Sequence, residues 1–241
     1  MQKKISVCIA VYNGKNFIKK QLESILIQLN EIDEIIIVDD CSTDNTISII
    51  NSFNDKRIKL FELDKNIGHV KAFNMALTES TGDIIFLSDQ DDFWEEQRVS
   101  RLVFELINNN AILVNSTFGD VQIQGEKNIS KYNYVGESDR IKNIFNIILG
   151  KVPYFGNTFC FNVKLKMKIL PIPNWVEAHD LYIGLMANIL GNVVHYNEVT
   201  IYRTIHKNNL TVKNKRNIFK IIKSRLLMLL IILKGFKKII V

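Results

Sequence analysis

Three aspartates, Asp89, Asp91 and Asp92, lie within four positions directly after the apolar run "DIIFL", which is typical of a buried strand. Carboxylates this close repel one another unless a positive charge compensates them. A hard cation such as Mg²⁺ or Mn²⁺ prefers oxygen ligands and often joins one or two carboxylates to substrate phosphates. The segment therefore indicates a divalent metal site, with the alternative that Asp92, Glu95 and Glu96 only cap the next helix and complement its dipole.

Alternating strands and helices are predicted to position this cluster. Continuous apolar runs predict strands at 5–11, 34–40, 57–63 and 83–89, and apolar side chains at helical spacing predict helices near 17–29, 47–53, 69–79 and 95–108. Strands that alternate with helices of this length imply an α/β fold with a mostly parallel sheet covered on both faces.

Ligands of such sheets bind beyond the carboxyl ends of the strands. Asn13, Asp39, Asp40 and the 89–92 cluster all fall at those ends. Neither GxGxxG nor GxxxxGK[ST] occurs in the chain, so the usual glycine-rich loops are not available to hold phosphates. A bound cation is the expected replacement.

Composition limits the class of protein. The chain has 241 residues and 47% hydrophobic residues, enough for one large core or one core plus an appendage. Its three cysteines have neither CxxC spacing nor an even number, which favours a reducing compartment, the cytoplasm. The run "ISVCIAV" after "MQKK" is only seven residues long, so we interpret it as a first strand and not as a signal peptide.

The charge is unevenly distributed. The net charge is +6, but 11 of the 31 Lys and Arg follow Glu198, whereas all 25 Asp and Glu lie at or before it, so residues 1–198 carry −5. Because the excess basic charge lies in one terminal segment and not on a folded face with interleaved aromatics, nucleic-acid binding is not expected.

The terminal segment 213–241 reads as a basic amphipathic helix. It contains the apolar run "LLMLLIIL", and several basic residues fall on one helical stripe: Arg216, Lys220, Lys223, Lys234 and Lys238. Eight apolar residues cannot span a bilayer, which needs about 20. A helix lying in an anionic membrane interface is predicted, and the alternative is packing against a partner subunit or the chain's own body.

Five motifs carry a resemblance to a known family: "SVCIAVYNG", "EIIIVDDCSTDNT", "NIGHVKAFNMAL", "TGDIIFLSDQDDFW" and "AHDLYIGLMA". In this order they resemble glycosyltransferase family 2, and the last two particularly resemble its bacterial rhamnosyltransferase-like members. The resemblance implies a glycosyltransferase A-type fold, a nucleotide-sugar donor, a divalent metal (Mn²⁺ or Mg²⁺), and inverting transfer by single displacement.

Residue roles follow from the resemblance motif by motif. The general base would be Asp180 in "AHDLY", and the metal would be held by Asp91 most directly, with Asp89 and with His206 in "HKNN". The base of the donor nucleotide would contact Asp39. The other residues that would bind the donor nucleotide are Val11, Asn13, Asp40, Asn66 and Asp89. The acceptor would contact Trp94, Gly156, Asn157 and His179.

Each of these roles has an alternative. Asp39 could cap the turn "CSTD", Asp180 could cap the helix "LYIGLMANIL", and His206 could be a hydrogen-bonded structural residue. The family pattern usually runs Tyr-Arg-x-His, whereas "YRTIH" has one more residue, which leaves the register of Tyr202 and Arg203 open.

The sequence thus predicts a metal-dependent inverting glycosyltransferase. It would move sugar from a UDP- or dTDP-sugar, such as dTDP-rhamnose, to a saccharide or lipid-linked acceptor in bacterial surface polysaccharide synthesis, at the inner face of the cell membrane. Residues 1–110 would bind the donor, 111–212 would bind the acceptor and carry the base, and 213–241 would contact the membrane. The alternatives are a metal-dependent nucleotidyl- or phosphotransferase, and a non-catalytic module that binds a nucleotide sugar or nucleic acid.

Overall fold

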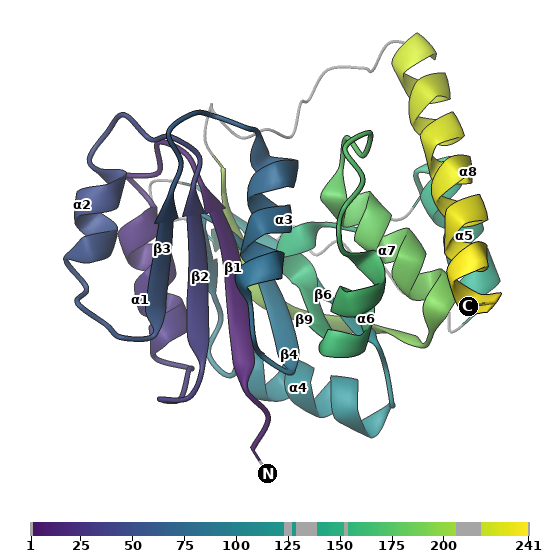
Figure 1. The fold of residues 1–241 in the computed structure, drawn as a ribbon. Helices are drawn as coiled ribbons and strands as arrows, with labels where there is room; N and C mark the ends of the chain where they lie inside the picture. The colour runs from purple at the N-terminus through teal and green to yellow at the C-terminus, as the bar shows by residue number, and fades with distance from the viewer. Residues whose placement is uncertain (1, 123–126, 129–138, 152–153, 206–217, 241) are drawn as a thin grey trace.

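A computed structural model describes residues 2–122, 127–128, 139–151, 154–205 and 218–240. It shows a central sheet with helices on both faces, with β3 toward one end of the molecule and helices α5 and α8 at the other (Figure 1).

The strands run through both predicted halves of the chain. They are β1 (Ile5–Val11), β2 (Glu34–Asp39), β3 (Ile58–Glu62), β4 (Ile84–Asp89), β5 (Asp92–Trp94), β6 (Leu113–Gln122), β7 (Lys127–Asn128), β8 (Phe159–Asn162) and β9 (Val193–Ile205). The helices are α1 (Ile18–Leu26), α2 (Thr46–Asn51), α3 (His69–Glu79), α4 (Arg98–Asn108), α5 (Arg140–Leu149), α6 (Val163–Ile169), α7 (His179–Leu190) and α8 (Ile218–Ile240), with a 3₁₀ turn at Gly156–Thr158.

The sheet has a parallel half and a mixed half. Its order is β3-β2-β1-β4-β8-β6-β9-β5, with β7 paired to β6. Strands β1 to β4 are mutually parallel, as predicted. Beyond them β8 is antiparallel to both β4 and β6, β9 is parallel to β6, and β5 is antiparallel to β9. The parallel order therefore holds for the half built from the first 89 residues, and the second half departs from it.

Local periodicity located most elements of the first half. The observed strand β1 and helix α3 have the predicted bounds, 5–11 and 69–79. Helix α4 begins three residues later than predicted, because residues 92–94 pair with β9 and the amide of Glu95 donates to the carbonyl oxygen of Thr200 at 2.9 Å. The chain turns into the helix only after Gln97, which has a left-handed backbone with φ of 62°.

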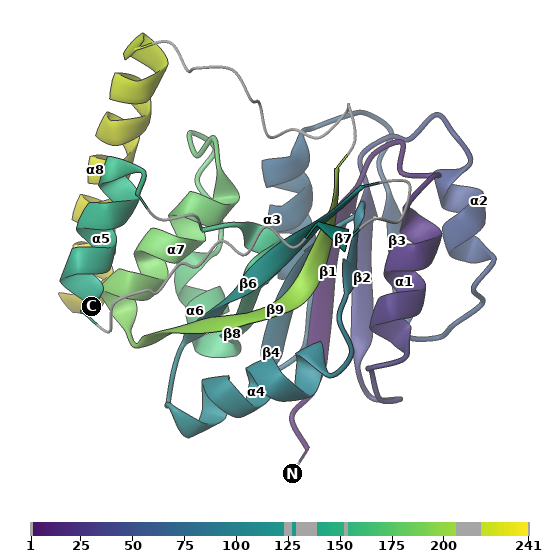
Figure 2. The same ribbon diagram turned by 180° about the vertical axis from the view of Figure 1, so that it is seen from behind.

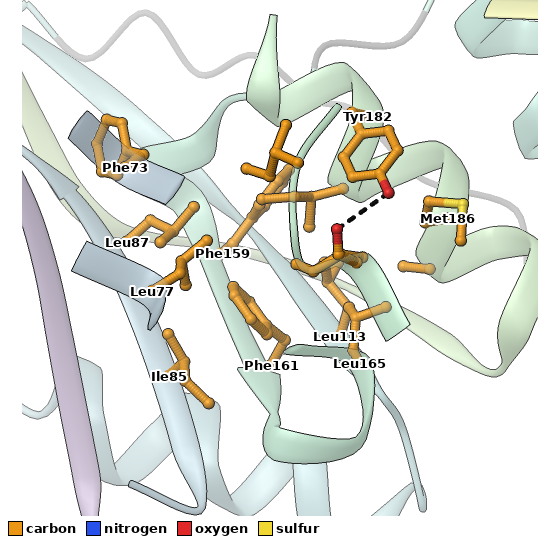
Figure 3. Close-up of a cluster of buried hydrophobic side chains, with 14 of the residues drawn as sticks. Phe73, Leu77, Ile85, Leu87, Leu113, Phe159, Phe161, Leu165, Tyr182 and Met186 are labelled. Carbon is orange, nitrogen blue, oxygen red and sulfur yellow. Dashed lines mark hydrogen bonds between the residues drawn. The ribbon is translucent and has the colours of Figure 1, made fainter. Parts of the chain in front are cut away.

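Two buried clusters, one on each face, fix the helices to the sheet. Helices α1 and α4 cover one face of the sheet, and α3, α6 and α7 cover the other (Figure 2). Their buried side chains belong to two separate clusters. Figure 3 shows part of the second cluster, where the hydroxyl of Tyr182 donates to the carbonyl oxygen of Ile169 at 3.0 Å. This contact ties α7 to α6, so the start of α7 has a fixed place beside the sheet.

The terminal helix α8 packs on the body of the chain, which was one of the two alternatives for it. Met228 and Ile231 are buried in the same cluster as α7. A side chain at Gly235 would come within 2.8 Å of Ile189, so a glycine allows the close approach of α8 to α7. Among the described helices, none is long and apolar enough to cross a membrane.

Candidate active site

The carboxyl ends of β1 and β2 lie side by side at the end of the sheet that is opposite the N-terminus (Figure 1). Hydrogen bonds connect the segments that follow the two strands. The amide of Asp40 donates to the carbonyl oxygen of Val11 at 2.7 Å. Asn13 has φ of 50°, and its Oδ1 accepts a hydrogen bond from the amide of Thr43 at 2.8 Å. Asn13 therefore shapes the surface of this predicted nucleotide site, because it holds the turn after β2 against the end of β1.

Asp39 is fully buried, and its two carboxylate oxygens have different surroundings. Oδ1 accepts a hydrogen bond from the amide of Ser42 at 2.7 Å, which is the turn-capping contact considered as an alternative role. Oδ2 is buried and has no partner within the described residues. A buried acceptor without a partner is costly unless a ligand supplies a donor, so capping and ligand binding use different oxygens here.

Both carboxylate oxygens of Asp40 form hydrogen bonds with the backbone of the chain. Its two oxygens accept hydrogen bonds from the amides of Ile67, at 2.6 Å, and Gly68, at 2.9 Å. The exposed side chain of Asn66 donates to the carbonyl oxygen of Asp40 at 3.1 Å. Asp40 thus fixes the loop that enters α3.

The acidic cluster spans the end of β4 and the start of β5. Asp92 is only 2% exposed; its Oδ2 accepts a hydrogen bond from the side-chain amide of Asn157, and its Oδ1 has no partner within the described residues. Burial, together with repulsion from Asp89 and Asp91, raises the pKa of Asp92 well above its usual range. Repulsion between neighbouring carboxylates therefore acts at the end of β4.

Asp89 shows which distant residue joins the cluster. Burial raises the pKa of Asp89 to about 7, with further contributions from the charges of Asp91 and Asp180, and Arg203 acts in the opposite direction. The fold therefore brings Asp180 close enough to Asp89 for the two carboxylates to interact. The predicted base and the predicted metal carboxylates belong to one site.

Arg203 is a positive charge that the sequence left unassigned. It lies opposite Asp92 in the pairing of β5 with β9, and its Nη2 is 2.9 Å from Oδ1 of Asp120. Its guanidinium carbon also lies 4.6 Å from the ring centroid of Phe118. Because Arg203 is already paired with Asp120, its charge offsets the repulsion within the cluster only in part.

Asp180 lies in the first turn of α7, and Ala178 occupies the N-cap position. Its Oδ1 accepts a hydrogen bond from the amide of Leu181 at 2.7 Å. The N-cap role considered for Asp180 is therefore not the observed one. Acidic side chains are favoured in the first turn of a helix, where Asp180 lies.

His179 and the Gly156–Thr158 turn line the same side of the site. His179 is 7% exposed, its ring stacks on Phe73 with centroids 4.3 Å apart, and neither ring nitrogen has a partner within the described residues. Burial lowers its pKa to about 3, with a smaller contribution from His69, so the ring is neutral at physiological pH. A side chain at Gly156 would come within 2.7 Å of Nε2 of His179, so glycine keeps this approach open.

Two further residues predicted for the site are Trp94 and His206. Trp94 is 4% exposed, and its indole N–H donates to the hydroxyl of Ser88 at 3.0 Å; its contact with the acceptor stays a prediction. Its ring packs against Phe86, with the ring centroids 5.2 Å apart. His206 lies outside the described residues.

Arg98 is a buried cation below the site that sequence reasoning missed. Its side chain is fully buried and donates to Ser116, Thr200 and, at 2.7 Å, to the carbonyl oxygen of Asn157. Arg98 thereby holds the residue that contacts Asp92. A basic residue in an amphipathic helix is usually exposed, so the sequence contained no signal of this role.

An open cavity of about 240 Å³ adjoins the start of α3. It is lined by residues 67–71, Asn74 and residues 172–174 and 176. His69, on its wall, makes an edge contact with His179 at 5.8 Å between centroids, which places the cavity beside the predicted acceptor side.

The cluster fits a divalent cation in its charge and chemistry. Within the described residues no group of three His, Cys, Asp or Glu side chains could hold a metal ion by itself. Asp89 and Asp91 nevertheless offer oxygen ligands close to other carboxylates, and a cation that shares its coordination with substrate phosphates needs only one or two carboxylates.

Comparison with known proteins defines the class. Residues 6–165 match the family described as glycosyl transferase family 2, and the chain belongs to this family. The fold is of the glycosyltransferase A type, as expected from the resemblance.

Among its relatives, an uncharacterised glycosyltransferase of Haemophilus influenzae is 31% identical over 51% of this chain and 50% of its own length. The putative teichuronic acid biosynthesis glycosyltransferase TuaG of Bacillus subtilis is 30% identical over 58% of this chain and 57% of its own length. WfaP of Escherichia coli, a UDP-Glc:α-D-GlcNAc-diphosphoundecaprenol β-1,3-glucosyltransferase, is 39% identical over 41% of this chain and 39% of its own length. The chain spans about half to two thirds of the length of the first relatives it matches.

Two solved structures share the fold. TarS 1–349 of S. aureus, in complex with UDP-GlcNAc, has a TM-score of 0.72 at 18% identity and covers 94% of this chain and 66% of its own. The mannosyltransferase PcManGT of Pyrobaculum calidifontis, in complex with GDP-Man and Mn²⁺, has a TM-score of 0.65 at 19% identity and covers 87% of this chain and 59% of its own.

Proposed function

We propose that this glycosyltransferase is a metal-dependent, inverting enzyme that uses Asp180 as its general base. The observation that carries the proposal is the electrostatic contact of Asp180 with Asp89 across a long stretch of sequence. A base and a set of metal-binding carboxylates at one edge of the sheet are what single-displacement transfer from a nucleoside diphosphate sugar requires.

The donor nucleotide would lie over the ends of β1 and β2. The buried Oδ2 of Asp39 would accept a hydrogen bond from the N–H of the uracil or thymine base, which supports a UDP- or dTDP-sugar, dTDP-rhamnose included, as the donor. Val11 and Asn13 would border the base, while Asp40 would hold the loop that carries Asn66 against the nucleotide.

Asp91, with Asp89 and His206, would hold a divalent cation, Mn²⁺ or Mg²⁺. When bound, the cation supplies charge stabilisation to the departing diphosphate. Asp92 would keep the cluster electronegative and, through Asn157, fix the neighbouring turn. Arg203 would limit the repulsion among the carboxylates while remaining paired with Asp120.

The transfer step assigns the remaining roles. The acceptor hydroxyl oxygen attacks the anomeric carbon as the bond from that carbon to the diphosphate oxygen breaks. Asp180 takes the hydroxyl proton, an assistance that is typically worth 10²- to 10⁴-fold in rate. His179 is neutral and has free ring nitrogens within the described part of the chain, so it would orient the acceptor beside Gly156 and Asn157.

The acceptor would be a saccharide or a lipid-linked saccharide of a bacterial surface polysaccharide. The named substrate of WfaP and the named process of TuaG support this class of acceptor. The basic segment after Glu198 supports a location at the inner, anionic face of the cell membrane and not on nucleic acid.

Donor turnover tests the proposal. The 241-residue chain would be incubated with Mn²⁺, a bacterial lipid extract, and UDP-, dTDP- and GDP-sugars labelled in the sugar or in the nucleotide. We expect the sugar label to move to an acceptor and the nucleotide label to be released as the diphosphate. Transfer of the nucleotide label would instead identify a nucleotidyltransferase, and binding without turnover would identify a non-catalytic module.

A further inference from the structure

The outermost layer of the molecule, formed by α5 and α8, exposes two stripes of large apolar side chains. On α8 the side chains that are 46 to 76% exposed are Phe219, Ile222, Leu226, Leu229, Leu230 and Leu233. On α5 three side chains spaced four residues apart are 59 to 66% exposed, Ile141, Phe145 and Leu149. Single exposed apolar residues are common on protein surfaces, but a contiguous set of this kind marks an interaction site.

The exposed stripe of α8 is separate from the face that packs on the body. At about 100° per residue, the six exposed side chains fall within an arc of about 100°, on the side opposite Met228, Ile231 and Gly235. The latter three are buried against the chain. The outward apolar face is therefore not needed to hold α8 in place.

The two helices lie side by side at one end of the molecule, as both views show (Figures 1 and 2). Arg225 of α8 donates to the carbonyl oxygen of Ile147 of α5 at 3.4 Å. We define the α5/α8 surface as the nine exposed apolar side chains of these two helices.

The charge of the same two helices is of one sign. The sequences of α5 and α8 contain Arg140, Lys142, Lys220, Lys223, Arg225, Lys234, Lys237 and Lys238, and neither helix contains Asp or Glu. A surface that is apolar and basic matches an anionic lipid interface, where apolar side chains enter the boundary of the acyl chains and Lys and Arg contact the headgroups. A second copy of the chain fits less well, since a twofold contact would bring this positive surface against itself.

We propose that the α5/α8 surface is a docking face for an anionic phospholipid bilayer. This extends the membrane contact from the terminal helix to α5, whose part the sequence did not reveal. The proposal rests on the proposed function only in naming a lipid-linked substrate as the reason for docking.

Contacts across α8 connect this face to the site. Lys223 pairs with Glu177, and Nζ of Lys234 lies 4.8 Å from the centroid of a Trp175 ring. Both partners precede Asp180 by a few residues. These contacts hold α8 against the segment that precedes Asp180. A membrane bound at the α5/α8 surface would therefore lie near the site and could present a lipid-linked acceptor to it.

Vesicle binding of the 241-residue chain tests the proposal. Sedimentation would compare vesicles of phosphatidylcholine alone with vesicles that also contain phosphatidylglycerol. The variants are Leu226→Glu with Leu233→Glu on α8, and Ile141→Glu with Phe145→Glu on α5. The matched control is Phe104→Glu with Ile107→Glu, an exposed apolar pair on α4.

We expect binding to the anionic vesicles only, weakened by salt, and at least about tenfold weaker in each test variant, because each loses two apolar anchors. The control should bind like the unchanged chain, and all variants should keep the circular dichroism spectrum and melting temperature of the fold. Absence of binding to anionic vesicles, or binding that the α5 variant leaves unchanged, would overturn the two-helix proposal. A lipid-independent dimer that the same substitutions abolish would do so in favour of a second copy.

Sugar transfer to a water-soluble acceptor separates this proposal from the proposed function. Vesicle binding that fails while transfer persists contradicts the docking face alone. Transfer that fails while vesicle binding persists contradicts the proposed function alone.

Discussion

Glu34, at the amino end of the parallel strands, and Asp89, at their carboxyl end, have pKa values that are shifted in opposite directions. At the amino end, Glu34 is 2% exposed and accepts hydrogen bonds from the hydroxyl of Ser6 at 2.6 Å, the amide of Thr81 at 2.7 Å, and the ammonium groups of Lys59 at 2.8 Å and Lys4 at 3.1 Å. Burial would raise the pKa of Glu34, but these hydrogen bonds outweigh it and hold the pKa at about 2.

At the carboxyl end of β4, Asp89 and Asp92 lie in different surroundings. Asp89 has a pKa raised to about 7 by burial and by neighbouring carboxylates, and the buried Oδ1 of Asp92 has no partner within the described residues. One end therefore stabilises the fold, while the other retains an electrostatic strain that a ligand can relieve. Groups with strongly shifted pKa values are common at functional sites, where their charge can interact with a ligand.

The largest effect is expected for Asp180→Asn. This substitution keeps the size of the side chain and removes its ability to take a proton. The transfer rate should fall by at least about 10²-fold with little change in donor affinity. Steady-state rates at saturating donor and acceptor measure this, and Glu79→Gln, at an exposed carboxylate, is the matched control. Near-normal transfer by Asp180→Asn would remove it from the role of base.

Glu34→Ala should mainly affect stability. It leaves Lys4 and Lys59 without their shared partner and the buried hydroxyl of Ser6 without its acceptor. The free energy of unfolding should fall by about 2 kcal/mol, less than for a fully buried pair because both lysines are partly exposed. Urea unfolding measures the change, and donor affinity should stay the same in the folded protein. A loss of donor binding without a loss of stability would contradict the comparison.

Asp89→Asn should change the free energy of unfolding in the opposite direction. It removes one charge from a cluster of like charges, so the metal-free protein should gain about 1 kcal/mol in the free energy of unfolding. The same variant should bind the donor more weakly in the presence of Mn²⁺. If it unfolds more easily than the unchanged chain in EDTA, the carboxyl end is not electrostatically strained.

The two ends should also respond to pH in opposite directions. The folded-state pKa of Glu34 is lowered, so its stabilisation is complete above about pH 4.5 and is lost as the pH falls toward 2. The folded-state pKa of Asp89 is raised, so its penalty is absent below about pH 4 and grows as the pH rises toward 7. The free energy of unfolding would be measured in EDTA at several pH values. Asp89→Asn should reduce the loss of stability as the pH rises toward 7, and Glu34→Gln should reduce the loss of stability as the pH falls toward 2. Parallel profiles for the unchanged chain and both variants would contradict these assignments.

The sequence could place Asp39 and Asp89 at one edge of the sheet because strand runs and helical periodicity are local signals. It could not supply the pairing of Asp92 with Arg203, since β5 and β9 are far apart in the chain and meet only through tertiary packing. The insertion of β8 between β4 and β6 has the same origin. Arg98 was missed because arginine in an amphipathic helix is usually exposed, whereas here it is fully buried.

The central claim is that Asp91 and its neighbours hold a cation that carries the donor's diphosphate. Calorimetric titration of UDP, dTDP and GDP into the unchanged chain, into Asp91→Asn, and into the control Glu79→Gln, each with Mn²⁺ and with EDTA, tests it directly. We expect at least one nucleotide to bind the unchanged chain and the control only with Mn²⁺, and Asp91→Asn to lose this metal-dependent binding while keeping its melting temperature. Unchanged nucleotide affinity in Asp91→Asn, or binding that EDTA does not reduce, would contradict the claim.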